Sequence, residues 1–208
     1  MATSPNEDYL ISGGNDNYIL LGDLKTFKCH KFDCGHQLPI RAVAWSNNGR
    51  LIISSSNDCT IKLRYFDLEK GTVCDQITSL PQMHNDFMYG ATISGNDLYV
   101  IGGSTDSTVG FWKTSTTEFI HNSTVHKGFV WNVSPSPEID KKFYIATSSS
   151  DGTVKIWDVS ISDLGIAEPC CSLPVIPEID IVGCDFTGSI IEDERLKDLI
   201  TANGGILN

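Results

Sequence analysis

The chain has 208 residues, of which 40% are hydrophobic and 20% charged. This composition suffices for a globular domain with a core and excludes a disordered chain. The formal net charge is −11, and because such a surface repels phosphate backbones and anionic membranes, direct nucleic-acid and membrane binding are disfavoured. The sequence contains neither a membrane-length apolar run nor the regions of a signal peptide, which predicts a cytoplasmic or nuclear protein.

Four segments of the chain have the same pattern. Each has an apolar strand that ends in small residues, a tight turn that contains an aspartate, and a second strand. The turn aspartates are Asp16, Asp58, Asp106 and Asp151. Asp151 and Gly152 are typical of a primed hairpin turn, which requires positive φ. In chain order the segments are LISGGNDNYILLGDL (10–24), LIISSSNDCTIKLRYFDL (51–68), LYVIGGSTDSTVGFWKT (98–114) and YIATSSSDGTVKIWDV (144–159).

Further strands are predicted on both sides of these hairpins. Those before the later hairpins, each preceded by a histidine, are IRAVAWS (40–46), MYGATIS (88–94) and VWNVSPS (130–136). Those after the hairpins are KCHKF (28–32), TVCDQI (72–77), EFIHN (118–122) and CCSLP (170–174). The first unit is expected to begin at its second strand, because few residues precede Tyr9. Four antiparallel strands in each unit of this length are typical of a β-propeller blade.

The predicted fold is therefore an all-β propeller of four-stranded antiparallel blades in one domain, 1–208. The units span about 9–33, 36–78, 84–123 and 126–175, with an incomplete fifth unit at 178–208. In the fifth unit, 179–186 is expected to be the first strand and 190–200 a helical surface insertion. Fewer than five blades predict an incomplete ring, that is, a fragment of a longer protein. The alternative is a small four-bladed ring, closed by 179–186 onto the first unit.

This pattern resembles the WD-repeat family of propellers, whose units carry Gly-His near the start and Trp-Asp near the end. The fourth unit is the most similar, with His126, Asp151 and Trp157-Asp158. The other units depart from the family pattern. Lys113 follows the tryptophan of the third unit, and Arg64 and Gly22 replace that tryptophan in the second and first units.

The resemblance implies a hydrogen-bonded tetrad in each blade, formed by the loop histidine, a hydroxyl residue, the turn aspartate and the tryptophan. Buried donors without partners cost about 1–3 kcal/mol each, which gives such a network a structural purpose. A catalytic triad would be present once and intact, so this graded repetition predicts no catalytic residue and no enzyme. The implied tetrad residues are His126, Thr147, Asp151 and Trp157 in the fourth unit, His36, Ser54 and Asp58 in the second, and His84, Asp106 and Trp112 in the third, where Gly102 has the hydroxyl position.

Four residues that lie close together in the sequence are of the types that bind zinc: Cys29, His30, Cys34 and His36. Their spacing lacks a Cys-x2-Cys knuckle, and ordinary strand and loop positions explain them better. The seven cysteines are expected to be reduced thiols. We therefore predict no metal, no cofactor and no small-molecule substrate.

In the resembled family, the loop before the first strand and the turn between the second and third strands share one rim, where members hold peptides. The residues expected there include two aromatic pairs, the residue types that dominate binding hot spots. Some of these rings could instead pack between blades, and for Tyr89 and Trp131 both alternatives stay open. The rim residues are Pro39, Arg41, Phe87, Tyr89, Phe129 and Trp131, with Lys127 at the polar edge.

These features predict a non-catalytic scaffold that binds partner peptides or protein domains. The acidic charge is compatible with basic partners, although a role in solubility is the favoured explanation of it. The alternatives are a chromatin- or replication-associated adaptor and a ubiquitin-ligase adaptor. A propeller enzyme is a further, less favoured alternative.

Overall fold

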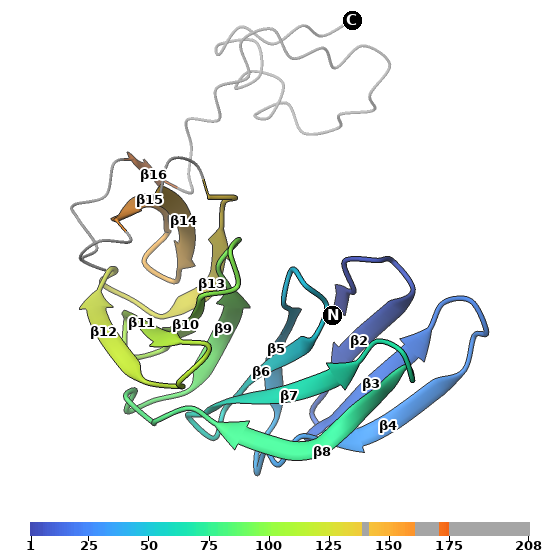
Figure 1. Ribbon diagram of the computed structural model, residues 1–208. Coiled ribbons are helices and arrows are strands. Elements are labelled where there is room, and N and C mark those ends of the chain that lie inside the picture. Colours follow the sequence, from blue (N-terminus) through green and yellow to red (C-terminus); the bar gives the residue numbers. More distant parts are fainter. Residues whose placement is uncertain (139–141, 161–170, 175–208) are drawn as a thin grey trace, which may run out of the picture. The chain divides into compact units, whose positions relative to one another are not determined.

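The computed structural model describes residues 1–138, 142–160 and 171–174 (Figure 1). Contacts divide the chain into Met1–Leu173 and Pro174–Asn208. The predicted fifth unit, including the helical insertion at 190–200, lies outside the described residues. No helix in the described part of the chain is long and apolar enough to cross a membrane.

The described strands form four sheets, each of four strands that are consecutive in the sequence (Figure 1). We call these sheets blades 1 to 4. Blade 1 contains β1 (Ala2–Thr3), β2 (Tyr9–Gly13), β3 (Tyr18–Asp23) and β4 (Cys29–Asp33). Blade 2 contains β5 (Ile40–Trp45), β6 (Leu51–Ser56), β7 (Ile61–Asp67) and β8 (Thr72–Ser79). Blade 3 contains β9 (Met88–Ile93), β10 (Tyr99–Ser104), β11 (Thr108–Lys113) and β12 (Phe119–Thr124). Blade 4 contains β13 (Val130–Pro135), β14 (Lys142–Ser149), β15 (Thr153–Ser160) and β16 (Cys171–Pro174).

The apolar cores lie between consecutive blades. In blade 2, Ile52 packs with side chains of blade 1, and its neighbour Ile53 packs with side chains of blade 3. β6 and β10 are buried along their whole length because both faces of these strands are covered. A third core joins β10 and β11 of blade 3 to β14 and β15 of blade 4 through Phe111, Phe143 and Trp157. This arrangement confirms the predicted all-β architecture of four-stranded antiparallel propeller blades.

The expectation that the first unit begins at its second strand is wrong. Ala2 pairs with Ile11 and Thr3 pairs with Leu10, so β1 takes the place of the first strand of blade 1. The strand stops there because the backbone N–H of Ser4 closes the following turn onto the carbonyl of Tyr9, at 2.8 Å. A strand of two residues is too short to show a polar–apolar alternation. β1 also occupies part of the edge of β2 that the alternative four-bladed ring would need.

The turn between the second and third strands has the same backbone in every blade. The residue after each aspartate has positive φ, and its N–H donates to the carbonyl three residues earlier, for example Gly152 to Ser149 at 3.3 Å. The aspartate itself does not have positive φ, so the turn is type I followed by one left-handed residue. The primed turn predicted for Asp151 and Gly152 is therefore wrong. The left-handed residues are Asn17 (φ 67), Cys59 (φ 64), Ser107 (φ 74) and Gly152 (φ 78).

Candidate functional site

Blade 4 brings its four implied tetrad residues together. His126 Nδ1 lies 3.0 Å from Asp151 Oδ2, and His126 Nε2 lies 2.7 Å from Thr147 Oγ1. Trp157 donates its indole N–H to the same hydroxyl oxygen at 2.9 Å. Because Thr147 accepts from the indole and donates to Nε2, the imidazole proton belongs on Nδ1, where it meets the carboxylate. Each buried donor in this network has an acceptor.

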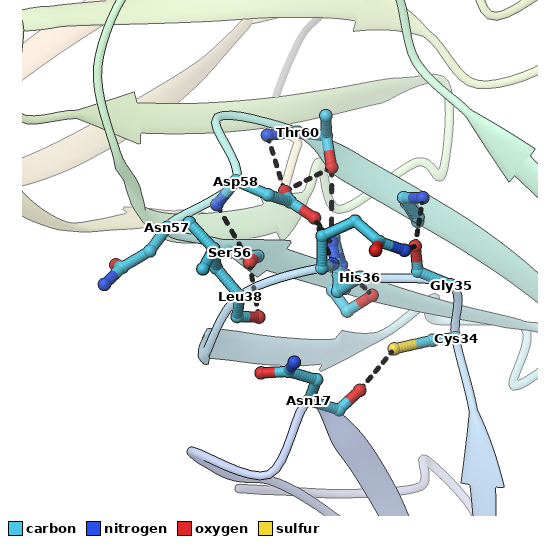
Figure 2. A network of polar contacts seen from close by, with 12 residues as sticks. Asn17, Cys34, Gly35, His36, Leu38, Ser56, Asn57, Asp58 and Thr60 are labelled. Atoms are coloured by element: carbon cyan, nitrogen blue, oxygen red, sulfur yellow. Dashed lines mark hydrogen bonds and ion pairs between the residues drawn. The ribbon is translucent and has the colours of Figure 1, made fainter.

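Blade 2 has the same arrangement without the tryptophan, and Figure 2 shows the surrounding polar contacts. His36 Nδ1 lies 2.9 Å from Asp58 Oδ2, and its Nε2 lies 3.0 Å from Ser54 Oγ. Arg64 fills the place of the indole. Its Nη1 donates to the carbonyl of Asp33 at 2.7 Å, and Cζ lies 5.5 Å from the centroid of the Phe32 ring. Arg64 therefore connects blade 2 to the last strand of blade 1.

Blade 3 lacks the hydroxyl. His84 Nδ1 lies 3.1 Å from Asp106 Oδ2, but Gly102 stands where the other two blades have Ser54 and Thr147. Trp112 donates its indole N–H to the carbonyl of Pro81 instead, at 3.1 Å. Within the described residues, His84 Nε2 is buried and has no hydrogen-bond partner.

A threonine two positions after the turn aspartate belongs to each of these networks, and it was not among the predicted tetrad residues. Thr153 Oγ1 donates to Asp151 Oδ1 at 2.6 Å and lies 3.1 Å from His126 Nδ1. Thr60 has the equivalent contacts in blade 2 (Figure 2). Thr108 has them in blade 3. The signal was available, because Asp-x-Thr occurs in all three units. In blade 1, Tyr18 stands at that position.

Burial and hydrogen bonding set the protonation states in blade 4. Burial lowers the pKa of His126 more than the Asp151 carboxylate raises it, so the imidazole is neutral near pH 7. Burial alone would raise the pKa of Asp151, but hydrogen bonds from Thr153, from the backbone N–H of Lys127 and from His126 hold it well below its usual value. Burial likewise lowers the pKa of His36 in blade 2. A neutral histidine beside an ionised carboxylate is the combination that this network requires.

Three of the predicted rim residues lie at β-bulges. The pairing of β5 with β6 skips Arg41, that of β9 with β10 skips Tyr89, and that of β13 with β14 skips Trp131. In each blade the skipped residue is the fifth after the loop histidine. A bulge turns its extra residue out of the regular pleat, so equivalent side chains of three blades share one edge of the structure.

The side chains at these bulges contact one another. Arg41 Cζ lies 5.3 Å from the centroid of the Tyr89 ring. The rings of Tyr89 and Trp131 meet edge to face at a centroid distance of 5.0 Å, and Phe129 meets Trp131 in the same way at 5.8 Å. We call Arg41, Tyr89, Trp131 and Phe129 the rim cluster. It extends over blades 2, 3 and 4.

The rim cluster is exposed to solvent, although its rings contact one another. Phe129 is 46% exposed and Trp131 42%, Arg41 is exposed, and Tyr89 is half-buried. Tyr89 and Trp131 therefore contact each other at the surface and do not join the cores between blades. Gly90 allows the close approach, because a Cβ at this residue would lie 3.1 Å from the Cα of Asn132.

The other predicted rim residues lie beside the cluster. Phe87 is 40% exposed and Lys127 is exposed. Pro39 is half-buried, and its carbonyl accepts the backbone N–H of Asn57 at 3.1 Å. The cysteines and histidines between Cys29 and His36 have different surroundings. His36 belongs to the blade 2 network, and the buried Cys34 thiol lies 3.8 Å from the carbonyl of Asn17 (Figure 2).

Comparison with known proteins agrees with this architecture. The family model "WD domain, G-beta repeat" matches residues 24–64 and 117–158. The chain is 28% identical over 161 residues to protein tipD of Dictyostelium discoideum, a match that covers 77% of this chain and 25% of the relative. It is 24% identical over 158 residues to apoptotic protease-activating factor 1 of Rattus norvegicus, covering 76% of this chain and 12% of that protein.

A third relative is meiotic fizzy-related protein 1 of Schizosaccharomyces pombe, 27% identical over 150 residues, which are 71% of this chain and 34% of the relative. The chain thus spans about a third or less of the length of these three proteins. Four-stranded blades, the histidine–aspartate pairs at their turns and the matched repeats lead to one conclusion. The described part of the chain consists of β-propeller blades, and it contains WD repeats at the segments that the family model matches.

Proposed function

We propose that the protein is a non-catalytic scaffold that binds partner peptides or protein domains through the rim cluster, with Phe87 and Lys127 at its border. WD-repeat relatives support a role in protein interaction at the level of the family. The observation that carries the proposal for this chain is the exposed contact between Tyr89 and Trp131, which continues to Arg41 and Phe129.

The rim cluster has the chemistry of a binding hot spot. Tryptophan, tyrosine and arginine are the residue types that contribute most to protein interfaces. Large apolar groups that are exposed side by side on one surface usually mark a contact site. Because the rings of Tyr89, Trp131 and Phe129 already restrain one another, a partner would lose less side-chain entropy in ordering them.

The polar residues beneath the rim support a structural role rather than a catalytic one. In blade 4, both imidazole nitrogens of His126 contact protein groups, and Asp151 accepts hydrogen bonds from Thr153 and from the backbone of Lys127. The same geometry recurs in blade 2. We propose that these networks hold the loops from which the rim cluster projects, and that the protein acts in the cytoplasm or nucleus.

The proposal is tested by comparing the partners retained by the wild-type protein with those retained by Trp131→Ala, Phe129→Ala and Phe87→Ala. Tyr65→Ala is the matched control, because Tyr65 is 49% exposed and pairs with Leu51, at the end of the blade away from the turn. Captured proteins would be quantified by mass spectrometry, and thermal melting would confirm that each variant is folded.

We expect the Trp131 and Phe129 variants to reduce the same set of partners by about tenfold or more, which corresponds to the loss of about 1.4 kcal/mol of binding free energy. Tyr65→Ala should retain wild-type amounts. Folded rim variants that retain every partner at the wild-type level would refute the proposal.

A further inference from the structure

The cations at the rim differ from four lysines elsewhere in the chain. Lys25, Lys31, Lys70 and Lys113 each lie within 3.5 Å of an aspartate or glutamate oxygen. In the part of the chain that the structure describes, neither Arg41 nor Lys127 takes part in an ion pair. The rim cluster therefore has a cation without an ion pair at one end, Arg41, and a second, Lys127, two residues before Phe129 in the sequence.

Arg41 is held in one position by two neighbours. Its Nε donates to Asn57 Oδ1 at 2.8 Å, and its Cζ lies over the ring of Tyr89. Asn57 is itself fixed, because its backbone N–H donates to the carbonyl of Pro39. The two Nη groups carry the remaining N–H donors, and they have no acceptor among the described residues. A guanidinium with a free pair of parallel N–H groups is suited to a bidentate carboxylate.

The turn aspartates of blades 2, 3 and 4 form no ion pair with Arg41 or Lys127. The side chains of Asp58, Asp106 and Asp151 are only 10%, 19% and 13% exposed, and each is directed to its histidine. Asp86 is a further carboxylate of these loops. It is half-buried, and its Oδ1 accepts the backbone N–H of Phe87 at 2.8 Å.

This inference rests on the proposed function and specifies its ligand. We infer that the rim cluster recognises an acidic peptide segment. An aspartate or glutamate carboxylate of the partner binds the Nη groups of Arg41, and an apolar side chain nearby packs on Trp131 and Phe129. The formal net charge of −11 favours basic partners for the surface as a whole. Charges more than about 8 Å away are screened at physiological ionic strength, so the local cations determine the choice at the rim.

The test is selection of peptides from a random 12-residue display library on the whole protein. Wild type, Arg41→Glu and Trp131→Ala would be compared with Arg50→Glu, which changes an exposed arginine in the turn between β5 and β6. We expect wild type and Arg50→Glu to enrich peptides with an aspartate or glutamate at a fixed spacing from an apolar residue. Arg41→Glu should replace that acidic residue with lysine or arginine, and Trp131→Ala should lose the apolar preference.

Affinity measurement on the selected consensus peptide completes the test. Replacing its acidic residue with the corresponding amide should weaken binding to the wild-type protein at least tenfold and weaken binding to Arg41→Glu little. If wild type enriches neutral or basic peptides that still depend on Trp131, the acidic ligand is wrong and the proposed function stands. If no variant of the rim cluster alters the enriched peptides, the proposed function is wrong as well.

Discussion

Trp112 donates its indole N–H to the backbone carbonyl of Pro81 at 3.1 Å, whereas the equivalent tryptophan of blade 4 uses a side-chain hydroxyl. The carbonyl gives the indole N–H a hydrogen-bond acceptor, but the neighbouring imidazole of His84 gains no partner from it. His84 Nε2, which would meet the hydroxyl, is buried without a partner in the described part of the chain. The networks therefore differ in completeness from blade to blade, and this difference leads to predictions about stability.

The complete network of blade 4 should contribute measurably to stability. Asp151→Ala removes the acceptor of His126, of Thr153 and of the backbone N–H of Lys127. We expect the free energy of unfolding to fall by about 1–3 kcal/mol, because the buried imidazole loses its partner. Asp16→Ala is the control. Asp16 stands in the equivalent turn of blade 1, where its exposed carboxylate contacts Lys31 and the backbone N–H of Tyr18, and its loss should leave the urea midpoint nearly unchanged.

Urea unfolding followed by tryptophan fluorescence would measure both variants under the same conditions. Equal midpoints for Asp151→Ala and the wild-type protein would show that the network is not a stabilising element.

The unrecognised threonines should matter in the same way. Thr153→Val keeps the shape of the side chain but removes the hydroxyl that lies 2.6 Å from Asp151 Oδ1. We expect a loss of about 0.5–1.5 kcal/mol, the usual net contribution of one hydrogen bond. Thr124→Val, at an exposed position of β12, is the matched control and should be nearly neutral. Calorimetric melting of the two variants would distinguish them, and a Thr153→Val melt identical to that of Thr124→Val would contradict this role.

Stability should decrease in two stages as the pH falls. Burial lowers the pKa of His36 and His126 in the folded state, so below the ordinary histidine pKa of 6.5 the unfolded chain binds more protons than the folded one. The first loss of stability therefore begins as the pH falls through about 6.5. The second begins near the ordinary aspartate value of 3.8, because the folded pKa of Asp106 and Asp151 lies well below it.

Urea midpoints measured between pH 8.5 and 5.5 would test the first stage. We expect a constant midpoint above pH 7 and a decreasing one below pH 6.5. A midpoint that rises on acidification would mean that the histidines gain protons on folding, contrary to the neutral tautomer required by Thr147.

Substitution should reduce the stability of the protein at Gly110 but hardly at Gly152. A Cβ at Gly110 would lie 2.6 Å from His84 Nε2 and 2.7 Å from Trp112 Cη2, so Gly110→Ala should cost about 1–3 kcal/mol through overpacking. A Cβ at Gly152 meets nothing within 4 Å, and Asn17 has the same left-handed conformation in blade 1. Gly152→Asn should therefore cost no more than about 0.5 kcal/mol. Paired thermal melts would measure the two effects, and an equal cost for both would refute this explanation.

The blades were predictable because their signals are local and repeated. Alternating apolar residues define β7 and β15, and an aspartate marks the turn before each. The positions of Ser54 and Thr147 followed from the family resemblance, since both lie a fixed distance before their turns. β1 was not predictable, because two residues cannot show a period.

Other contacts depend on the distance between neighbouring blades, which the sequence does not indicate directly. The acceptor of Trp112 is a backbone carbonyl, which any residue at position 81 could supply. The contact between Tyr89 and Trp131 depends on Gly90, where a side chain would meet the backbone of Asn132. Counting from each loop histidine placed both rings at the rim but could not decide whether they touch.

The bulges at Arg41, Tyr89 and Trp131 have a consequence for evolution. A residue that the strand pairing skips can be exchanged without altering the alignment of the residues on either side. Substitutions at these three positions therefore change the surface of the rim one blade at a time and leave the buried residues between the blades unchanged.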